Sequence, residues 1–283
     1  FWTPTYSRWS IYTNQKPEIS NVGIIQDQWK NYTSFLNNDY YFWPTNQQIM
    51  EIFKIKGSSE LFANSSIKYV IVPLRDLAND DDFFINYGGM RDPNIRDWYI
   101  AELDKVEWLG KIDIGTRELV VYENKNYKPH IYQTSERDSV YKNINFERSD
   151  FEFISPTEYK IELKNIKRNT YLNFSELYNE NWKLRIGDFK WYKVLTGSNY
   201  FLPDEYHFKN EVQLNSFYLN PEFIKKNFPG EFKENSDGSI DMDLTLYFQP
   251  QSYFYLGVII SGAALVGCVG LLIYFWRKQK KEK

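Results

Sequence analysis

The sequence has a single cysteine, only two histidines and no charged side chain between Tyr253 and Trp276. The lone cysteine, Cys268, excludes a disulfide within the chain. His130 and His207 lie far apart without a neighbouring ligand pattern, which argues against a zinc site. A glycine-rich phosphate loop and a Gly-x-Ser-x-Gly nucleophile elbow are also lacking. We therefore expect no cofactor, no metal and no catalytic residue in this segment.

The uncharged stretch predicts one membrane-spanning helix over residues 253–276. At about 1.5 Å rise per residue it is roughly 36 Å long, enough to cross a hydrocarbon core of about 30 Å. Aromatic residues flank both ends, and residues 277–283 form a basic tail. The positive-inside rule places this tail in the cytoplasm and the residues before 253 outside the cytoplasm, at the cell membrane. A buried core helix would be shorter and would not end in a cluster of cations.

The part before the span is long enough for two domains. The net charge of the chain is −3, which gives no basic footprint for nucleic acid. Aromatic residues make up 19% of the sequence. Such an excess serves core packing in β-rich domains, and it also supplies stacking platforms for sugars. We expect core packing to account for most of it.

Residues 1–132 predict a mixed α+β domain. Thr45 is placed to cap a helix with apolar residues at helical spacing, and a second helix is expected over 94–103. The β-branched run 67–72 predicts a strand buried on both faces, and residues 106–122 predict a hairpin. The acidic run 80–82 lies in a polar segment, 77–97, that we interpret as a solvated loop. A boundary is expected near residues 124–129.

Residues 133–250 predict an antiparallel β-sandwich of the jelly-roll kind, so that the whole chain is α+β with one C-terminal transmembrane helix. Apolar and polar residues alternate with period two in segments 151–163, 182–186 and 242–248, and strands are also expected at 170–178 and 212–219. Gly187 and Asp188 predict a turn into a further strand over 189–194. Residues 235–240 look like part of a calcium loop, but Lys233 and Leu244 stand where ligands are needed, so a hairpin turn explains them better.

Glu176, Tyr178 and Trp182 are the candidate binding residues. On a strand, Glu176 and Tyr178 share the face of the core residues Leu172 and Phe174. A carboxylate in that position is costly to bury without hydrogen-bond donors. The structural interpretation is that Glu176 bonds the backbone of the turn 179–181 above a buried Trp182. The functional one is that Glu176 binds sugar hydroxyls and an aromatic ring stacks on the sugar; we favour the structural interpretation.

Several short motifs, in order along the chain, resemble the C-terminal portion of bacterial YfhO-like multi-pass membrane proteins and related GT-C-class glycosyltransferase-like proteins. They lie at residues 61–73, 118–124, 155–163, 174–182, 215–219 and 248–251. Asn181 departs from the family pattern, in which glycine precedes the tryptophan. The resemblance implies an upstream transmembrane bundle that holds a lipid-linked sugar donor. Since that bundle is not in this sequence, we expect the chain to be the end of a longer protein.

Three function classes follow. The first is the extracytoplasmic portion of a membrane glycosyltransferase-like protein that assists glycan acceptor binding or braces the membrane bundle in cell-envelope glycan assembly. The second is a single-span surface binding or adhesion module. The third is a tethered hydrolase, whose paired carboxylates no sequence pattern can show. The expected partners are the lipid bilayer, the upstream bundle, and a glycan or lipid-linked sugar.

Overall fold

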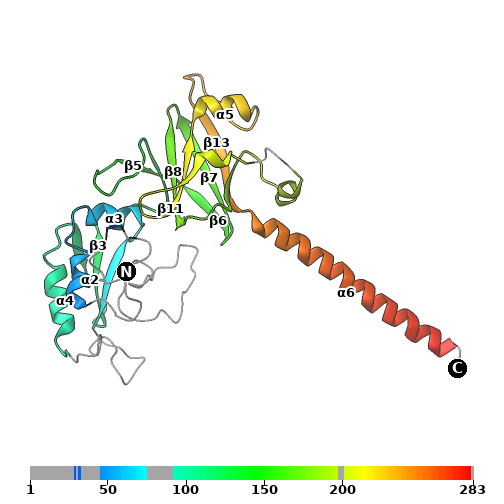
Figure 1. Cartoon of the computed structure of the whole chain (residues 1–283), viewed down its shortest axis with the longest axis horizontal. Helices are drawn as coiled ribbons and strands as arrows, with labels where there is room; N and C mark the ends of the chain where they lie inside the picture. The colour runs from blue at the N-terminus through cyan, green and yellow to red at the C-terminus, as the bar shows by residue number, and fades with distance from the viewer. Residues whose placement is uncertain (1–28, 30, 33–44, 75–91, 197–200, 282–283) are drawn as a thin grey trace.

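The computed structural model describes residues 29, 31–32, 45–74, 92–196 and 201–281. Its described parts are a small α+β unit, an antiparallel β-sandwich and a single long helix (Figure 1). This confirms the α+β fold class with a C-terminal apolar helix. The polar segment 77–97 lies largely outside the described residues.

In its described residues, the α+β unit contains a three-stranded antiparallel sheet and three short helices. The helices are α2 (Asn46–Glu51), α3 (Ser58–Asn64) and α4 (Ile95–Leu103). The sheet has the order β1-β3-β2, formed by Tyr69–Pro73, Leu119–Asn124 and Leu109–Ile112. Thr45 caps α2 through a reciprocal capping box with Gln48, as its position before the apolar run predicted.

Strand β1 is a half-buried strand, which corrects the expectation that both of its faces are buried. Val70 and Val72 are buried, whereas Tyr69, Ile71 and Pro73 are partly exposed. A continuous apolar run does not by itself distinguish a strand covered on both faces from one covered on a single face.

The sandwich is made of two five-stranded antiparallel sheets. The first has the order β10-β11-β8-β4-β5, formed by His207–Lys209, Leu214–Leu219, Thr170–Leu177, Ile131–Thr134 and Phe146–Arg148. The second has the order β12-β13-β7-β6, formed by Lys233–Glu234, Ile240–Phe248, Glu158–Ile166 and Phe151–Ser155, and β9 (Trp182–Ile186) also pairs with β13. Side chains of both sheets form one core.

Three further elements connect the strands of the sandwich. They are η2 (Trp191–Leu195), η3 (Asp204–Tyr206) and α5 (Pro221–Asn227). The expected strand over residues 189–194 is therefore wrong, because the chain forms the 3-10 helix η2 there instead. Strand β4 pairs with β8 and β5, so the division expected at residue 132 falls inside a strand of the sandwich.

The core of the α+β unit extends into the sandwich region. Val140, Val212 and Leu214 from the sandwich side pack with the buried residues of the first unit. Gly57 adopts a positive φ of 84°, and a Cβ added there would lie 2.2 Å from the carbonyl oxygen of Val140. The two units are thus in close backbone contact, and only glycine fits at this point.

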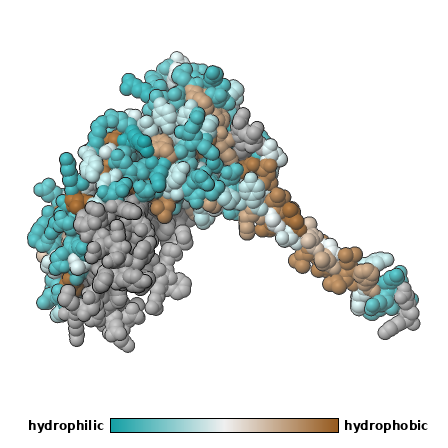
Figure 2. Space-filling model, in the orientation of Figure 1, coloured by the Kyte–Doolittle hydropathy of each residue, from teal (hydrophilic) through white to brown (hydrophobic). Residues whose placement is uncertain are grey.

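The last helix, α6, runs over Pro250–Lys281 for 32 residues and contains the predicted span. Among the described residues it is the one helix long and apolar enough to cross a membrane. Its side chains are exposed along the shaft, and Figure 2 shows an apolar shaft ending in a polar tip. The structure therefore supports a membrane anchor at the C-terminus, while the direction in which it crosses stays a prediction.

Candidate functional site

Trp182 lies in the core of the sandwich, with 7% of its surface exposed. Its ring centroid is 4.8 Å from that of Phe174 and 5.4 Å from that of Phe248. These contacts come from three strands of both sheets. They support the packing role that the structural interpretation gives to Trp182.

Glu176 sits at the end of β8, beside a buried histidine. Its Oε1 lies 3.7 Å from Nε2 of His130, and 30% of its side chain is exposed. Burial raises the pKa of the neighbouring Tyr159 hydroxyl, and the negative charge of Glu176 adds to that rise. His130 itself packs on the rings of Phe174 and Tyr159. Glu176 thus lies at the edge of the aromatic core beside His130. The backbone N–H groups of Asn179 and Asn181 in the turn, which the structural interpretation assigned to Glu176, donate instead to Asn215 Oδ1 and Asn179 Oδ1.

Tyr178 has different neighbours, on strand β10 of the first sheet. Its ring centroid is 5.0 Å from that of His207, and Lys209 Nζ is 6.0 Å from the centroid of the Tyr178 ring. His207 Nε2 is hydrogen-bonded to Oδ1 of Asn215 at 3.0 Å, and burial lowers the pKa of His207. Glycan binding by Glu176, Tyr178 and Trp182 stays a prediction, and Glu176 and Tyr178 are the two that keep exposed surface.

A second candidate site, which sequence reasoning missed, is a groove on the second sheet. Its volume is about 590 Å³. The polar residues among those that line it come from β6, β7, β13 and the ends of neighbouring turns. They are Asp150, Glu152, Lys160, Glu162, Asp188, Asp243 and Thr245. The groove therefore combines five carboxylates with one ammonium group.

Strand register explains the charge of the groove. Asp243 on β13 pairs directly with Glu162 on β7, and the next pair along the outer face joins Thr245 to Lys160. Like charges directly opposite each other in an antiparallel pair destabilise the sheet. Lys164 Nζ, 2.9 Å from Glu162 Oε1, offsets part of this cost. Exposed carboxylates gathered along one face can accept hydrogen bonds from hydroxyl groups and attract cationic groups.

The segment that looks like a calcium loop is a hairpin turn, as expected. Asp237 accepts hydrogen bonds from the backbone and hydroxyl of Ser239. Lys167 Nζ lies 2.8 Å from Asp237 Oδ2, and this ion pair is the main reason that the pKa of Asp237 is lowered. The Asp237 carboxylate thus serves to hold the hairpin turn together. Within the described residues, no group of three or more His, Cys, Asp and Glu side chains is arranged to hold a metal ion.

Comparison with known proteins finds no match among family models, curated proteins or solved structures.

Proposed function

We propose that this chain is the extracytoplasmic C-terminal portion of a membrane glycosyltransferase-like protein, and that its sandwich binds an acceptor glycan. The observation that carries the proposal is the groove on the second sheet. Strand β13 of that sheet ends at Phe248 and α6 begins at Pro250, so the groove is joined to the anchor through Gln249 alone.

The chemistry of the groove favours a hydroxyl-rich ligand. Carboxylates are strong acceptors for the hydroxyl groups of a sugar, and Lys160 supplies a donor. Phe189, at the rim, is half-buried and packs its ring 4.5 Å from that of Tyr247, which leaves part of its surface for an apolar sugar face. Because the groove is open at the surface, an oligosaccharide longer than the groove can also bind in it.

The anchor favours a ligand at the membrane surface. With the basic end of α6 in the cytoplasm, the groove would lie outside, where a lipid-linked sugar and a growing envelope glycan meet. The exposed side chains of α6 would face lipid or an upstream bundle of the same protein. A single-span adhesion module is the alternative, since it would use the same groove and the same anchor.

Binding can be tested on the full chain in lipid nanodiscs, titrated with envelope oligosaccharides and lipid-linked sugars. Glu162→Gln keeps the shape of the side chain but removes the charge in the groove. We expect about tenfold weaker binding, the cost of one charged hydrogen bond. The matched control is Glu147→Gln, an exposed carboxylate on β5 of the other sheet, which should bind as the unchanged chain does. Equal binding by both variants, or no binding by the unchanged chain, would sink the proposal.

Glu176→Gln tests whether the glycan binds in the groove or at the residues predicted from the sequence, Glu176, Tyr178 and Trp182. If Glu176 serves the structure through His130, the variant loses about 1–3 kcal/mol of unfolding free energy and keeps its glycan affinity. If the glycan binds at Glu176, the affinity falls and the melting temperature stays the same. Transfer from a lipid-linked donor, measured with the whole protein, then separates the glycosyltransferase-like role from adhesion.

A further inference from the structure

The 3-10 helix η2 is fastened to the first turns of α6. The Ser252 hydroxyl donates a hydrogen bond of 2.9 Å to the carbonyl oxygen of Trp191, and it lies 2.9 Å from the Tyr247 hydroxyl. Ser252 is fully buried. The Trp191 ring meets the ring of Tyr255 edge-on, with centroids 5.4 Å apart. Strand β13, η2 and α6 are therefore connected by buried contacts at the point where the helix leaves the sandwich.

These contacts fix the level of η2 along the helix axis. Tyr255 lies about 8 Å along α6 from Pro250, at about 1.5 Å per residue. It belongs to the aromatic group at the start of the apolar stretch, with Tyr253 and Phe254 exposed beside it. Because Trp191 packs on Tyr255, η2 lies beside α6 at the height of Tyr255 along the helix axis. If Tyr255 lies at the surface of a bilayer, η2 therefore lies at that surface too.

The side chains that η2 exposes suit the headgroup region. The Tyr192 side chain is 53% exposed, and Lys193 next to it is exposed as well. Tyrosine and tryptophan rings gather at membrane interfaces, and lysine extends its ammonium group toward the headgroups. An exposed tyrosine, an exposed lysine and a tryptophan on a single turn therefore lie at the level of two exposed aromatic residues of α6, around the point where the helix leaves the sandwich.

We propose that this surface, formed by Trp191, Tyr192, Lys193, Tyr253 and Phe254, docks on the lipid headgroups of the bilayer that α6 spans. We name it the interfacial patch. The occupant is lipid rather than protein because the patch is continuous with the candidate membrane span and has the residue types of a membrane interface. A second contact beside the helix restricts the tilt of the sandwich, and so holds its outer face at a set angle to the membrane. This inference does not depend on glycan binding.

Site-directed spin labelling of the full chain in phosphatidylcholine nanodiscs tests the patch. Cys268→Ser removes the one native thiol, after which single cysteines are introduced as Tyr192→Cys, Phe254→Cys and Lys226→Cys. Phe254, 63% exposed on α6, is the interfacial reference. Lys226 is exposed on α5, at the opposite end of the sandwich from α6, and is the aqueous reference (Figure 1). Collision rates of each label with oxygen, which enters lipid, and with a water-soluble nickel chelate are compared.

The proposal expects the label at position 192 to behave like the label at 254, with a collision rate with nickel several-fold lower than at 226 and a raised rate with oxygen. A nickel rate equal to that at position 226 overturns the proposal, because Tyr192 would then face water. Shielding from both reagents also overturns it, because a protein segment rather than lipid would cover the patch. The labels at 192 and 254 both facing water would show that this end of α6 lies outside the interface.

Discussion

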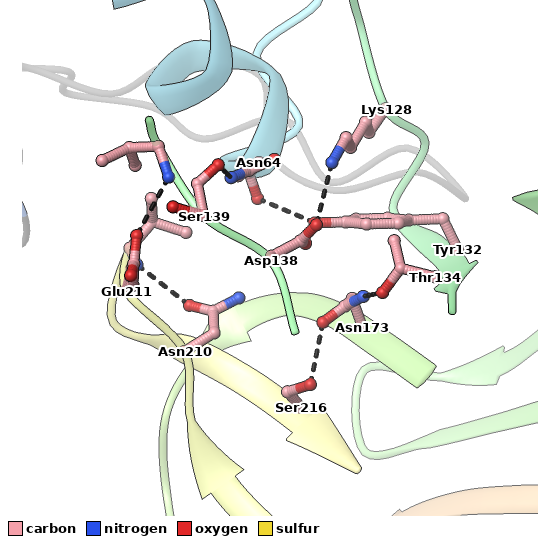
Figure 3. A network of polar contacts seen from close by, with 12 residues as sticks. Asn64, Lys128, Tyr132, Thr134, Asp138, Ser139, Asn173, Asn210, Glu211 and Ser216 are labelled. Carbon is pink, nitrogen blue, oxygen red and sulfur yellow. Dashed lines mark hydrogen bonds and ion pairs between the residues drawn. The ribbon is translucent and has the colours of Figure 1, made fainter. Parts of the chain in front are cut away.

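The junction between the two units and the outer face of the sandwich use carboxylates in opposite ways. At the junction, Asp138 is 1% exposed, and it accepts hydrogen bonds from Lys128, at 2.9 Å, and from the Tyr132 hydroxyl (Figure 3). On the outer face, Asp243 and Glu162 stand directly opposite each other on paired strands. Asp138 is buried between two hydrogen-bond donors, whereas Asp243 and Glu162 are exposed, like-charged neighbours of which Glu162 also pairs with Lys164.

This difference separates a structural role from a functional one. A buried charge persists only where partners replace the water that it loses. The partners of Asp138 are Lys128 and Tyr132, and the Tyr132 hydroxyl also lies 3.5 Å from the carbonyl oxygen of Asn64 on α3 of the first unit. Burial and the charge of Asp138 raise the pKa of Tyr132 well above its usual value, so the tyrosine stays a hydrogen-bond donor even in alkaline solution. Asp243 and Glu162 on the outer face are exposed, so a ligand can reach them, which is why the groove is the better candidate for binding.

The largest effect is expected from Lys128→Met. The variant fills a similar volume but leaves Asp138 buried without its ammonium partner. We expect a loss of about 3–5 kcal/mol of unfolding free energy, the usual cost of breaking a buried ion pair. Chemical denaturation of the chain in detergent, followed by tryptophan fluorescence, measures this loss.

The matched control for Lys128→Met is Lys142→Met. Lys142 pairs with Glu136, and both side chains are more than half exposed. An exposed pair of this kind contributes about 1 kcal/mol or less. Equal losses in the two variants would mean that the junction network does not hold the units together, and the contrast with the outer face would fail.

Gly57→Ala tests the close backbone contact at the same junction. Alanine at φ 84° is strained by about 1–2 kcal/mol, and its Cβ would also press on the carbonyl of Val140. With about 1–3 kcal/mol for the forced shift, we expect a total loss of about 2–5 kcal/mol.

Gly115→Ala separates the two contributions in Gly57→Ala. Gly115 has a φ of 76°, but nothing lies within 4 Å of an added Cβ. This variant should therefore show the backbone strain alone. If both glycine variants lose the same free energy, the contact between Gly57 and Val140 does not constrain the two units.

Much of the sandwich could be predicted from the sequence because its second sheet has one face in the core and one in water. Tyr159, Ile161 and Leu163 alternate with Lys160 and Glu162, and β7 forms there with the expected faces. The cap at Thr45 and the hairpin of β2 and β3 follow from equally local rules.

Strand β4 could not be predicted in this way. Ile131, Tyr132, Gln133 and Thr134 are all buried, because one face packs in the sandwich and the other against the junction, so the alternation disappears. Likewise, the strand expected over residues 189–194 is replaced by η2, at Trp191–Leu195, where Trp191 packs on α6 rather than in a sheet. The charge of the groove depends on register, since only pairing shows that Asp243 and Glu162 are neighbours.

The smallest expected effect has the opposite sign and comes from Asp243→Asn. The side chain keeps its shape, and the hydrogen bond from the Gly187 N–H to the Asp243 carbonyl is a backbone bond that the change leaves intact. Removing one of two opposed charges should leave the unfolding free energy unchanged or raise it by about 0.5 kcal/mol. The gain should shrink at 1 M salt, where the screening length falls to about 3 Å. The control is Asp237→Asn, an exposed carboxylate that pairs with Lys167 and should lose stability when its charge is removed. If Asp243→Asn loses stability as Asp237→Asn does, the carboxylate of Asp243 stabilises the fold. The contrast between structural carboxylates and the carboxylates of the groove would then fail.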